Sequence, residues 1–459
     1  MARGKYQRKP KFGAAWLVIL LLILIAGLLA AIYVEQNGGL FGLGGDSTTP
    51  TTTIETTTEA TTEEPTTVTT TVVTEPYITS TASIGVSGDI LLHGPVYNSA
   101  KSGSNYDFSD MLKFISEYYN RYDFMVANLE VPLAGAERGY SGYPLFNSPD
   151  AIANDLMEAG MDMMLTANNH TIDQGHDGMI RTQQVLLDAG MQYLGTQMTE
   201  EDPDYIVQDI NGIQVGMVCY TYETGDTSDG RKTLNGNPVP KKTTDLVTSF
   251  NPSELDAFYS EVEQHLAAMR DAGAEATIVF IHWGNEYELK QNAMQTTIAQ
   301  QLCELGVDVI VGGHPHVIQP FDTLVSTTGH ETYCIYSVGN ALSNQNRNSL
   351  SSVANSAYTE DGMIFGITFE KWNDGTVNLQ EITILPTWVN KYWSNAAGKN
   401  LYYIMPLDVA LESWEEFDVA NLSYTYGSYK RTLSIVGEGL NSYREAASLQ
   451  PLPLEKEKP

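Results

Sequence analysis

The sequence predicts an α/β fold, because short apolar segments alternate along the chain with longer amphipathic ones. Residues 277–282 and 307–311 are rich in β-branched side chains, as buried strands are. Residues 252–272 and 295–305 instead repeat their apolar side chains at helical spacing, and a glycine follows each of these two segments. A recurring unit of helix, glycine and strand is typical of α/β proteins.

The same criteria give an order of elements for the rest of the chain. The expected strands are residues 84–89, 124–128, 161–167, 214–220, 277–282, 307–311, 334–338, 364–369 and 377–385. The expected helices are residues 108–120, 149–159, 179–189, 252–272 and 295–305. The last two strands are expected to form a hairpin. Together these elements predict a domain over residues 81–390, followed by a C-terminal extension over residues 391–459 that is rich in Trp and Tyr and packs on the domain.

The N-terminus has the pattern of a membrane anchor. Residues 1–11 contain five basic residues and no acidic one, and an almost uninterrupted apolar run follows at residues 12–34. This run is long enough to cross a bilayer as a helix, whereas the core of a cleaved signal peptide, which is the alternative, is usually shorter. Because basic residues favour the cytoplasmic side, we expect a single-pass protein of the cell membrane with a cytoplasmic tail (1–11), a transmembrane anchor (12–34) and an extracellular C-terminal domain.

Residues 35–80 are expected to form a disordered linker between anchor and domain. Much of this segment is Thr with scattered Glu and Pro, and it has no apolar periodicity. It therefore buries too little apolar surface to offset the entropy lost on ordering. A spacer that holds the domain away from the membrane is the simplest interpretation.

The charge of the chain limits its partners. A formal net charge of −31 results from 56 acidic and 25 basic residues. This acidity excludes nucleic acid bound through a broad basic surface. An anionic polymer or a phosphate ester would need a local site or a metal ion. The three cysteines lie in apolar segments, which favours core positions over a disulfide framework; they are Cys219, Cys303 and Cys334.

The most informative motif follows the expected strand at residues 307–311. Two glycines end this strand, and His314, Pro315 and His316 come directly after them. Neutral imidazole is the commonest metal ligand in proteins, and the carboxyl ends of α/β strands are where such ligands are usually presented. The chain has only eight histidines, and six of them follow apolar runs. Histidine used in this way indicates a metal site.

Two earlier strand ends carry carboxylates. Asp89 follows a glycine, with His93 four residues later. A carboxylate there can reach a metal at the sheet edge, although Gly-Asp is also a common turn dipeptide. Asn128 and Glu130 point in the same direction if their strand continues, and the alternative is that they cap the strand.

Two further strand ends carry histidine. Asn169 and His170 follow the third expected strand, and an amide oxygen together with imidazole suits Zn, Mn or Fe. His282 closes the apolar strand at residues 277–282, where it is either a ligand or a core histidine. Glu286 is spaced to orient His282, to act as a general acid or base, or to lie in solvent. Asn340 follows a later strand and is expected to be structural.

Taken in order, these motifs resemble the CapA family. They are Gly-Asp, Asn-Leu-Glu, Asn-Asn-His with a following Asp-x-Gly, His-Trp-Gly-x-Glu, Gly-x-His-Pro-His and Gly-Asn, and they extend over about residues 83–345. The resemblance implies a role in poly-γ-glutamate capsule synthesis. It also implies a calcineurin-like metallophosphatase-type β-sandwich flanked by helices.

The resemblance also implies a metal site, carried over residue by residue. Asp89 and His316 would bind a first divalent ion. Asn169, His282 and His314 would bind a second. Glu130 would bridge the two ions, which are expected to be Mn, Fe or Zn. His170 corresponds to the acid-like histidine beside the phosphate. Glu286 is a second expected catalytic residue, on its spacing from His282 and not on the resemblance.

The sequence departs from the superfamily pattern at three positions. The spacing Asp-x-His is stretched, since His93 lies four residues after Asp89. An Asn-Leu-Glu segment replaces the usual bridging aspartate. His170 is followed by Thr171 where the superfamily has Asp or Glu. These departures leave the metal site possible without implying hydrolysis.

Three functions are compatible with this pattern. The first is biosynthesis, export or attachment of a poly-γ-glutamate-type capsule or other surface polymer, beside a membrane-bound polymer synthase complex. The second is a metal-dependent phosphoesterase that hydrolyses a cell-envelope phosphate ester. The third is a non-catalytic surface protein with a vestigial site. In the first two, an anionic polymer or a phosphate ester is the expected ligand.

Overall fold

The computed structural model of the chain describes residues 75–452. The expected cytoplasmic tail, the expected anchor and nearly all of the expected linker lie outside these residues, as does the end of the expected C-terminal extension. Among the described residues, no helix has both the length and the apolar character required to span a membrane.

A mixed first sheet contains the N-terminal strand at its centre. In spatial order its strands are β19 (Lys399–Pro406), β18 (Val377–Ser394), β17 (Asp361–Trp372), β1 (Ile78–Ile90), β4 (Phe124–Leu129), β5 (Met163–Leu165) and β6 (Gln192–Leu194). The half from β1 to β6 is parallel, and the half from β1 to β19 is antiparallel. A short strand, β16 (Asn340–Leu342), pairs in parallel with the end of β1.

The second sheet is built around a group of parallel strands. Its spatial order is β11 (Ser249–Phe250), β8 (Ile213–Tyr222), β12 (Ala276–His282), β13 (Val309–Gly313), β15 (Glu331–Ile335) and β14 (Phe321–Val325), with β7 (Tyr205–Ile210) paired to β8. β8, β12, β13 and β15 are parallel to one another. Parallel strands of this kind need covering on both faces, which explains their continuous apolar sequences.

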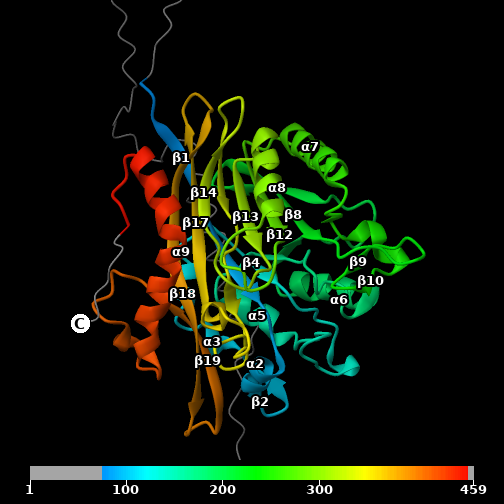
Figure 1. Cartoon of the computed structure of the whole chain (residues 1–459), viewed down its shortest axis with the longest axis vertical. Helices are drawn as coiled ribbons and strands as arrows, with labels where there is room; N and C mark the ends of the chain where they lie inside the picture. The colour runs from blue at the N-terminus through cyan, green and yellow to red at the C-terminus, as the bar shows by residue number, and fades with distance from the viewer. Residues whose placement is uncertain (1–74, 453–459) are drawn as a thin grey trace, which may run out of the picture. The chain divides into compact units, whose positions relative to one another are not determined.

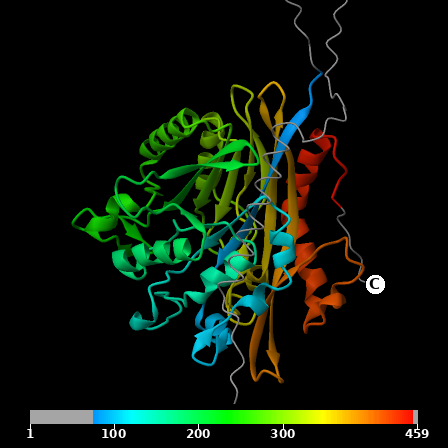
Figure 2. The same cartoon turned by 180° about the vertical axis from the view of Figure 1, so that it is seen from behind.

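The two sheets pack face to face over a shared apolar core. Val86 on β1 and Phe280 on β12 belong to one buried cluster that contains residues of both sheets. Helices cover the outer faces. Ile152 of α5 packs against the first sheet, and Val262 of α7 with Ile298 of α8 packs against the second. The mixed α/β prediction is therefore confirmed (Figures 1 and 2).

The helices include all five that were expected, the first of them in two parts, and two that were not, at residues 94–99 and 425–446. They are α2 (Gly94–Ser99), α3 (Ser109–Leu112), α4 (Ser116–Tyr119), α5 (Ala151–Glu158), α6 (Gly175–Asp188), α7 (Leu255–Asp271), α8 (Ala293–Glu304) and α9 (Thr425–Ala446). The helix expected over residues 108–120 is interrupted and forms α3 and α4. Its apolar spacing still holds, since Phe108, Leu112 and Ile115 are all buried. Two small hairpins complete the fold, β2 (Lys101–Ser102) with β3 (Asn105–Tyr106) and β9 (Thr233–Leu234) with β10 (Asn237–Pro238).

The C-terminal segment belongs to the domain, contrary to the expected boundary at residue 390. That boundary falls inside β18, which pairs with β17 on one side and with β19 on the other. α9 packs beside β14 and β18, and its Val436 and Leu440 lie in the core shared by the two sheets. Residues 391–446 are therefore part of the first sheet and its covering, which the aperiodic sequence after Pro386 did not reveal.

Candidate metal centre

Strand pairing brings the predicted site residues to one edge of the two sheets. Asp89 at the end of β1 lies opposite Asn128 of β4 and Asn340 of β16. In the second sheet, His282 at the end of β12 lies opposite Gly313 at the end of β13. Because carboxyl ends of parallel strands meet at the same edge, residues far apart in the sequence converge there.

Asp89, Glu130 and His316 form a first buried group of metal-ligating side chains. One ligand atom from each lies within 4.8 Å of the others. His316 Nδ1 is 3.2 Å from Asp89 Oδ2, and His316 Nε2 is 3.7 Å from Glu130 Oε1. All three residues are at most 1% exposed.

Glu130, His282 and His314 form a second group of the same size. His282 Nε2 lies 3.5 Å from Glu130 Oε1 and 2.9 Å from Asn169 Oδ1. The rings of His282 and His314 are 4.8 Å apart, centroid to centroid. Asn169 therefore lies beside this group, where its amide oxygen could be a further ligand.

Glu130 belongs to both groups, which is the arrangement a bridging carboxylate requires. Its Oε1 is buried and accepts no hydrogen bond from residues 75–452, and His314 Nδ1 is likewise buried without a hydrogen bond to any of these residues. An unpaired buried carboxylate oxygen costs several kcal/mol unless a cation balances it. Imidazole and carboxylate together suit Zn, Mn or Fe, so the residues present fit the expected ions.

The two histidines on either side of Pro315 differ in the direction of their pKa shifts. Burial alone would lower the pKa of His316, but the nearby Glu130 and Asp89 outweigh burial and raise this pKa to about 9. Burial alone would raise the pKa of Asp89, yet the hydrogen bond and charge of His316 hold it below its usual value. Burial keeps the pKa of His314 well below its usual value, and the charges of His282 and His316 add to the shift. In the metal-free protein, a proton therefore resides on His316.

The segment that carries His314 and His316 has a strained backbone. Both residues have left-handed backbone angles, with φ of 95° and 56°. Each such conformation costs about 1–3 kcal/mol for a residue other than glycine. Only glycine fits at position 312, because a Cβ there would overlap the carbonyl oxygen of Tyr336. The backbone is thus held in a form that directs both imidazoles into the cluster.

His170 lies beside the second group and is oriented by a carboxylate. Its Nδ1 is 2.8 Å from Asp173 Oδ2, and both side chains are almost fully buried. The backbone N–H of His170 donates to Asn168 Oδ1. Asp173 therefore supplies the carboxylate that the sequence lacks directly after His170.

Glu286 and His93 lie at the periphery. Glu286 is exposed, and its charge contributes to the raised pKa values of His316 and Tyr287. His93 precedes α2, and its Nδ1 lies 3.2 Å from the carbonyl oxygen of Leu91. Neither residue belongs to the two buried groups.

Several residues of the site carry no sequence signal of their own. The hydroxyl of Tyr222 lies 3.2 Å from His314 Nε2, and its ring is stacked on His282 at an interplanar angle of 11°. Asn128 donates to Asp89 Oδ1 and accepts from Asn168, so amides connect Asp89 to the His170 segment. Tyr222 ends an ordinary strand, and only its placement beside two histidines distinguishes it.

Asn340 has the structural role that the sequence predicts, and it acts directly on the site. Its Oδ1 is 3.2 Å from His316 Nδ1, and its Nδ2 donates to the carbonyl of His316 and to Gln345 Oε1. It therefore fixes both the backbone and the ring of His316.

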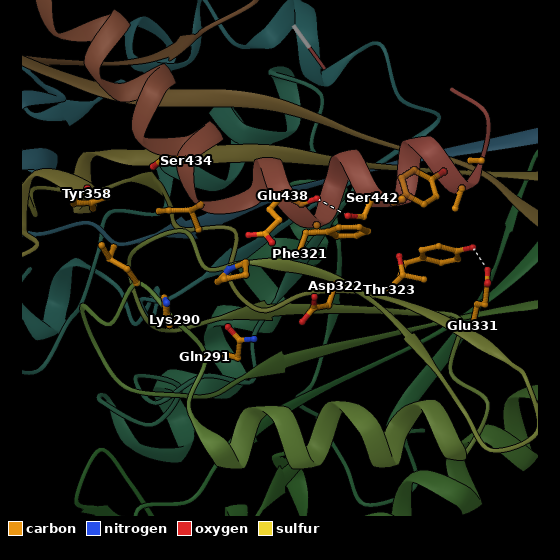
Figure 3. A pocket seen from close by; sticks show the side chains of 18 residues that line it. Lys290, Gln291, Phe321, Asp322, Thr323, Glu331, Tyr358, Ser434, Glu438 and Ser442 are labelled. Carbon is orange, nitrogen blue, oxygen red and sulfur yellow. Dashed lines mark hydrogen bonds between the residues drawn. The ribbon is translucent and has the colours of Figure 1, made fainter. Parts of the chain in front are cut away.

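A wide groove lies elsewhere, between α9 and β14 (Figure 3). Its volume is about 930 Å³, and its lining includes Phe321, Asp322, Tyr358 and Glu438. None of its lining residues belongs to the two buried groups. The metal-ligating cluster is a buried centre at the sheet edge and not part of this groove.

Two solved structures share limited similarity with the chain. Haemophilus influenzae NAD nucleotidase (NadN) has a TM-score of 0.39 and 11% identity, with 82% of this chain and 68% of that chain covered. The protein TT1561 of Thermus thermophilus has a TM-score of 0.33 and 10% identity, with 62% of this chain and 94% of that chain covered. These similarities are too low to assign a function.

Comparisons of sequence give a family. The capsule biosynthesis protein CapA of Bacillus anthracis is 27% identical over 264 residues, which are 56% of this chain and 59% of that protein. The PGA biosynthesis protein CapA of Bacillus subtilis (strain 168) is 23% identical over 240 residues, 51% of this chain and 57% of that protein. The match thus spans less than two thirds of either relative. The profile described as bacterial capsule synthesis protein PGA_cap matches residues 83–345, more than half of the chain, and the protein belongs to this family of bacterial capsule synthesis proteins.

Proposed function

We propose that the protein holds two divalent metal ions at the sheet edge and acts through them on an anionic surface polymer during capsule assembly. The observation that carries this proposal is the position of Glu130, whose unpaired buried oxygen is shared by two groups of ligands. Asp89 and His316 would complete one site, and His282, His314 and Asn169 the other. Divalent ions held by these residues would act as Lewis acids on a phosphate or carboxylate oxygen.

Family membership supports the process, and the charge of the chain supports the mode of binding. A poly-γ-glutamate-type capsule or a related polymer is rich in carboxylates, which a chain of net charge −31 repels except at a local site. A metal centre provides such a site. Two sheets with a common core and helices on their outer faces are also compatible with the expected calcineurin-like β-sandwich.

We further propose that residues 12–34 anchor the protein in the cell membrane, so that the domain acts outside the cell beside a polymer synthase complex. The basic residues before this apolar run support the orientation. Protease added to intact cells should then degrade the domain. A domain that is degraded only after lysis contradicts this orientation.

Phosphate-ester hydrolysis is a second candidate function, and the pair of His170 and Asp173 favours it. Their hydrogen bond fixes the tautomer of a buried imidazole next to Asn169. An imidazole oriented in this way can give a proton to a leaving group. In the assembly function the same imidazole would only donate a hydrogen bond to a bound anion.

Both candidate functions require bound divalent metal ions, so the metal content of the protein tests them together. Full-length protein purified without chelator should carry close to two Mn, Fe or Zn ions per chain, measured by mass spectrometry of the metals. Glu130→Gln keeps the shape of the side chain and removes its charge, so we expect loss of at least one ion. Glu288→Gln, at an exposed position, is the matched control. Trace metal in the wild-type protein that reconstitution does not restore would contradict the proposal.

A substrate panel separates the two functions. Phosphomonoesters, phosphodiesters and γ-glutamyl amides should be tested with the wild-type protein and with His282→Ala, His316→Ala and His170→Gln. Turnover that all three substitutions abolish supports a hydrolase. Metal-dependent binding of γ-glutamyl chains without turnover supports a role in assembly.

A further inference from the structure

A half-buried lysine near the candidate metal centre has no acidic partner among the residues that the structure describes. Lys391 is on β18, and its Nζ donates a 2.7 Å hydrogen bond to Asn344 Oδ1. Burial lowers the pKa of Lys391, and no charged group in the described part of the chain offsets this shift. In a chain with more than twice as many acidic as basic residues, a partly buried cation without a carboxylate is unexpected.

Lys391 and Asn344 both have N–H donors that no described residue accepts, and no described carboxylate pairs with Lys391. Asn344 Oδ1 accepts from Lys391 Nζ and also from the hydroxyl of Tyr402, at 2.7 Å each. An ammonium group has three N–H donors and an amide nitrogen has two. Within the described part of the chain, Lys391 thus retains two donors beyond its bond to Asn344. The Asn344 amide nitrogen donates to no residue between 75 and 452. Such a set of donors is complementary to an anion.

Two connections place this pair beside the metal centre. Gln345, the residue after Asn344, accepts from Asn340 Nδ2 and donates to the hydroxyl of Tyr287. Asn340 in turn contacts His316. On the other side, burial lowers the pKa of His93 to about 4; the hydrogen bond with Leu91 opposes this shift, and the charges of His316, His170 and Lys391 add to it. His93 therefore lies within electrostatic range of both Lys391 and the centre.

We propose that Lys391 and Asn344 form an anion-binding subsite beside the metal centre, which takes a second carboxylate or phosphate of a substrate whose first anionic group is held at the metals. This inference rests on the proposed function and narrows it. The substrate carries at least two anionic groups, as a polyanionic chain does. Lys391 lies beyond residues 83–345, so the family match does not include it.

Binding of small probes to the full-length, Mn²⁺-loaded protein tests the subsite. Titration calorimetry should compare inorganic phosphate, a γ-glutamyl trimer and propane-1,3-bisphosphate. Lys391→Met should lower the affinity for the more tightly bound of the two multivalent probes about tenfold, which is the usual effect of losing one charge-assisted hydrogen bond. The affinity for inorganic phosphate should change less than about twofold. If the γ-glutamyl trimer binds more tightly, the anionic group at the subsite is a carboxylate. If the bisphosphate binds more tightly, it is a phosphate.

Matched variants separate a binding role from a structural one. Lys391→Arg keeps the charge and should retain binding within about threefold. Asn344→Asp keeps both hydrogen bonds that Asn344 Oδ1 accepts, but it places a carboxylate of the protein itself beside Lys391. It should therefore lower the affinity for the same probe as strongly as Lys391→Met does. Lys290→Met removes an exposed cation from the same chain and should have no effect.

The outcomes also separate this inference from the proposed function. The subsite is overturned if Lys391→Met and Asn344→Asp bind the multivalent probes like the wild-type protein, if phosphate binding falls equally, or if metal-loaded wild-type protein binds none of the probes. Lys391-dependent binding of a multivalent probe by protein that holds no metal would support the subsite and contradict the metal proposal.

Discussion

At the scale of single residues, the site depends on side chains that hold the ligands as much as on the ligands themselves. Tyr222, Asn340 and Asp173 each fix one imidazole. Asp173 and Asn340 stand in the predicted motifs, but their spacing does not show which imidazole each one holds. The ligands could be predicted because each follows an apolar strand, where burying a polar side chain costs free energy unless it has a partner. The contacts of the supporting residues could not be predicted, because tyrosine and asparagine are common at strand ends and only the folded chain shows which imidazole each one contacts.

Tyr222→Phe isolates one such contribution. The substitution keeps the ring on His282 and removes only the hydroxyl that lies 3.2 Å from His314 Nε2. Loss of a group that orients a metal ligand typically lowers metal affinity about 10- to 100-fold, and we expect about tenfold here. Competition with a fluorescent chelator measures the change. The control is Tyr220→Phe on the same strand as Tyr222, which removes a hydroxyl that is hydrogen-bonded to His265 of α7. Equal effects of the two substitutions on metal affinity would contradict the role of Tyr222.

Metal binding should release a proton from His316. Its pKa of about 9 means that the metal-free protein carries this proton at neutral pH, and a coordinating imidazole must lose it. Metal affinity should therefore fall as the pH decreases below about 9. Calorimetry at neutral pH in buffers of different ionisation enthalpy should give about one proton released per chain. His316→Gln should abolish this release, and a wild-type protein that releases none would contradict the proton's location.

The same proton affects the stability of the metal-free protein. A histidine whose folded pKa lies above its unfolded value of about 6.5 stabilises the fold fully below that value, and this contribution is lost as the pH rises to about 9. The loss is of order 3 kcal/mol. Urea unfolding of metal-depleted protein at about pH 6 and about pH 9, with His316→Gln as reference, measures it.

At the scale of elements, the parallel strands were the most predictable part, because continuous β-branched runs leave few alternatives. Strands such as β16 and β6 are only three residues long, too short for a period to appear. α9 was missed for a different reason. Its buried Leu433, Val436 and Leu440 follow helical spacing, but Ser, Thr and Gly lie among them on the same face and weaken the apolar pattern. The helix packs beside β14 and β18.

Gly439 on α9 gives a test of this packing. A Cβ at this position would overlap the carbonyl oxygen of Phe321, so Gly439→Ala should displace the helix and destabilise the protein by about 1–3 kcal/mol. Gly427→Ala, at the start of the same helix, meets only the flexible end of Arg431 and should be neutral or stabilising by up to about 1 kcal/mol. Urea unfolding compares the two. Equal stability of both variants would contradict close packing of α9.

At the scale of the whole molecule, the fold extends well beyond the segment that defines the family. The profile ends at residue 345, yet β17, β18, β19 and α9 all follow it and complete the first sheet. A chain that ends at residue 390 would lose part of β18 and the core residues of α9. It would also lose Arg431, which makes two 2.6 Å contacts with the buried carboxylate of Asp361. Leaving that carboxylate unpaired alone costs about 3–5 kcal/mol.

Together these losses exceed the net stability of a typical domain, about 5–15 kcal/mol, so we expect the chain ending at residue 390 to be insoluble or to melt without cooperativity. A chain ending at residue 452 retains every described contact and should melt like the full-length protein. Circular dichroism melting and the soluble fraction on expression compare the two. A soluble, cooperatively folded chain ending at residue 390 would show that the C-terminal segment is a separate covering. Failure of this chain to fold, which we expect, would mean that the fold and the proposed anion subsite both require the segment after residue 390, since Lys391 belongs to that segment.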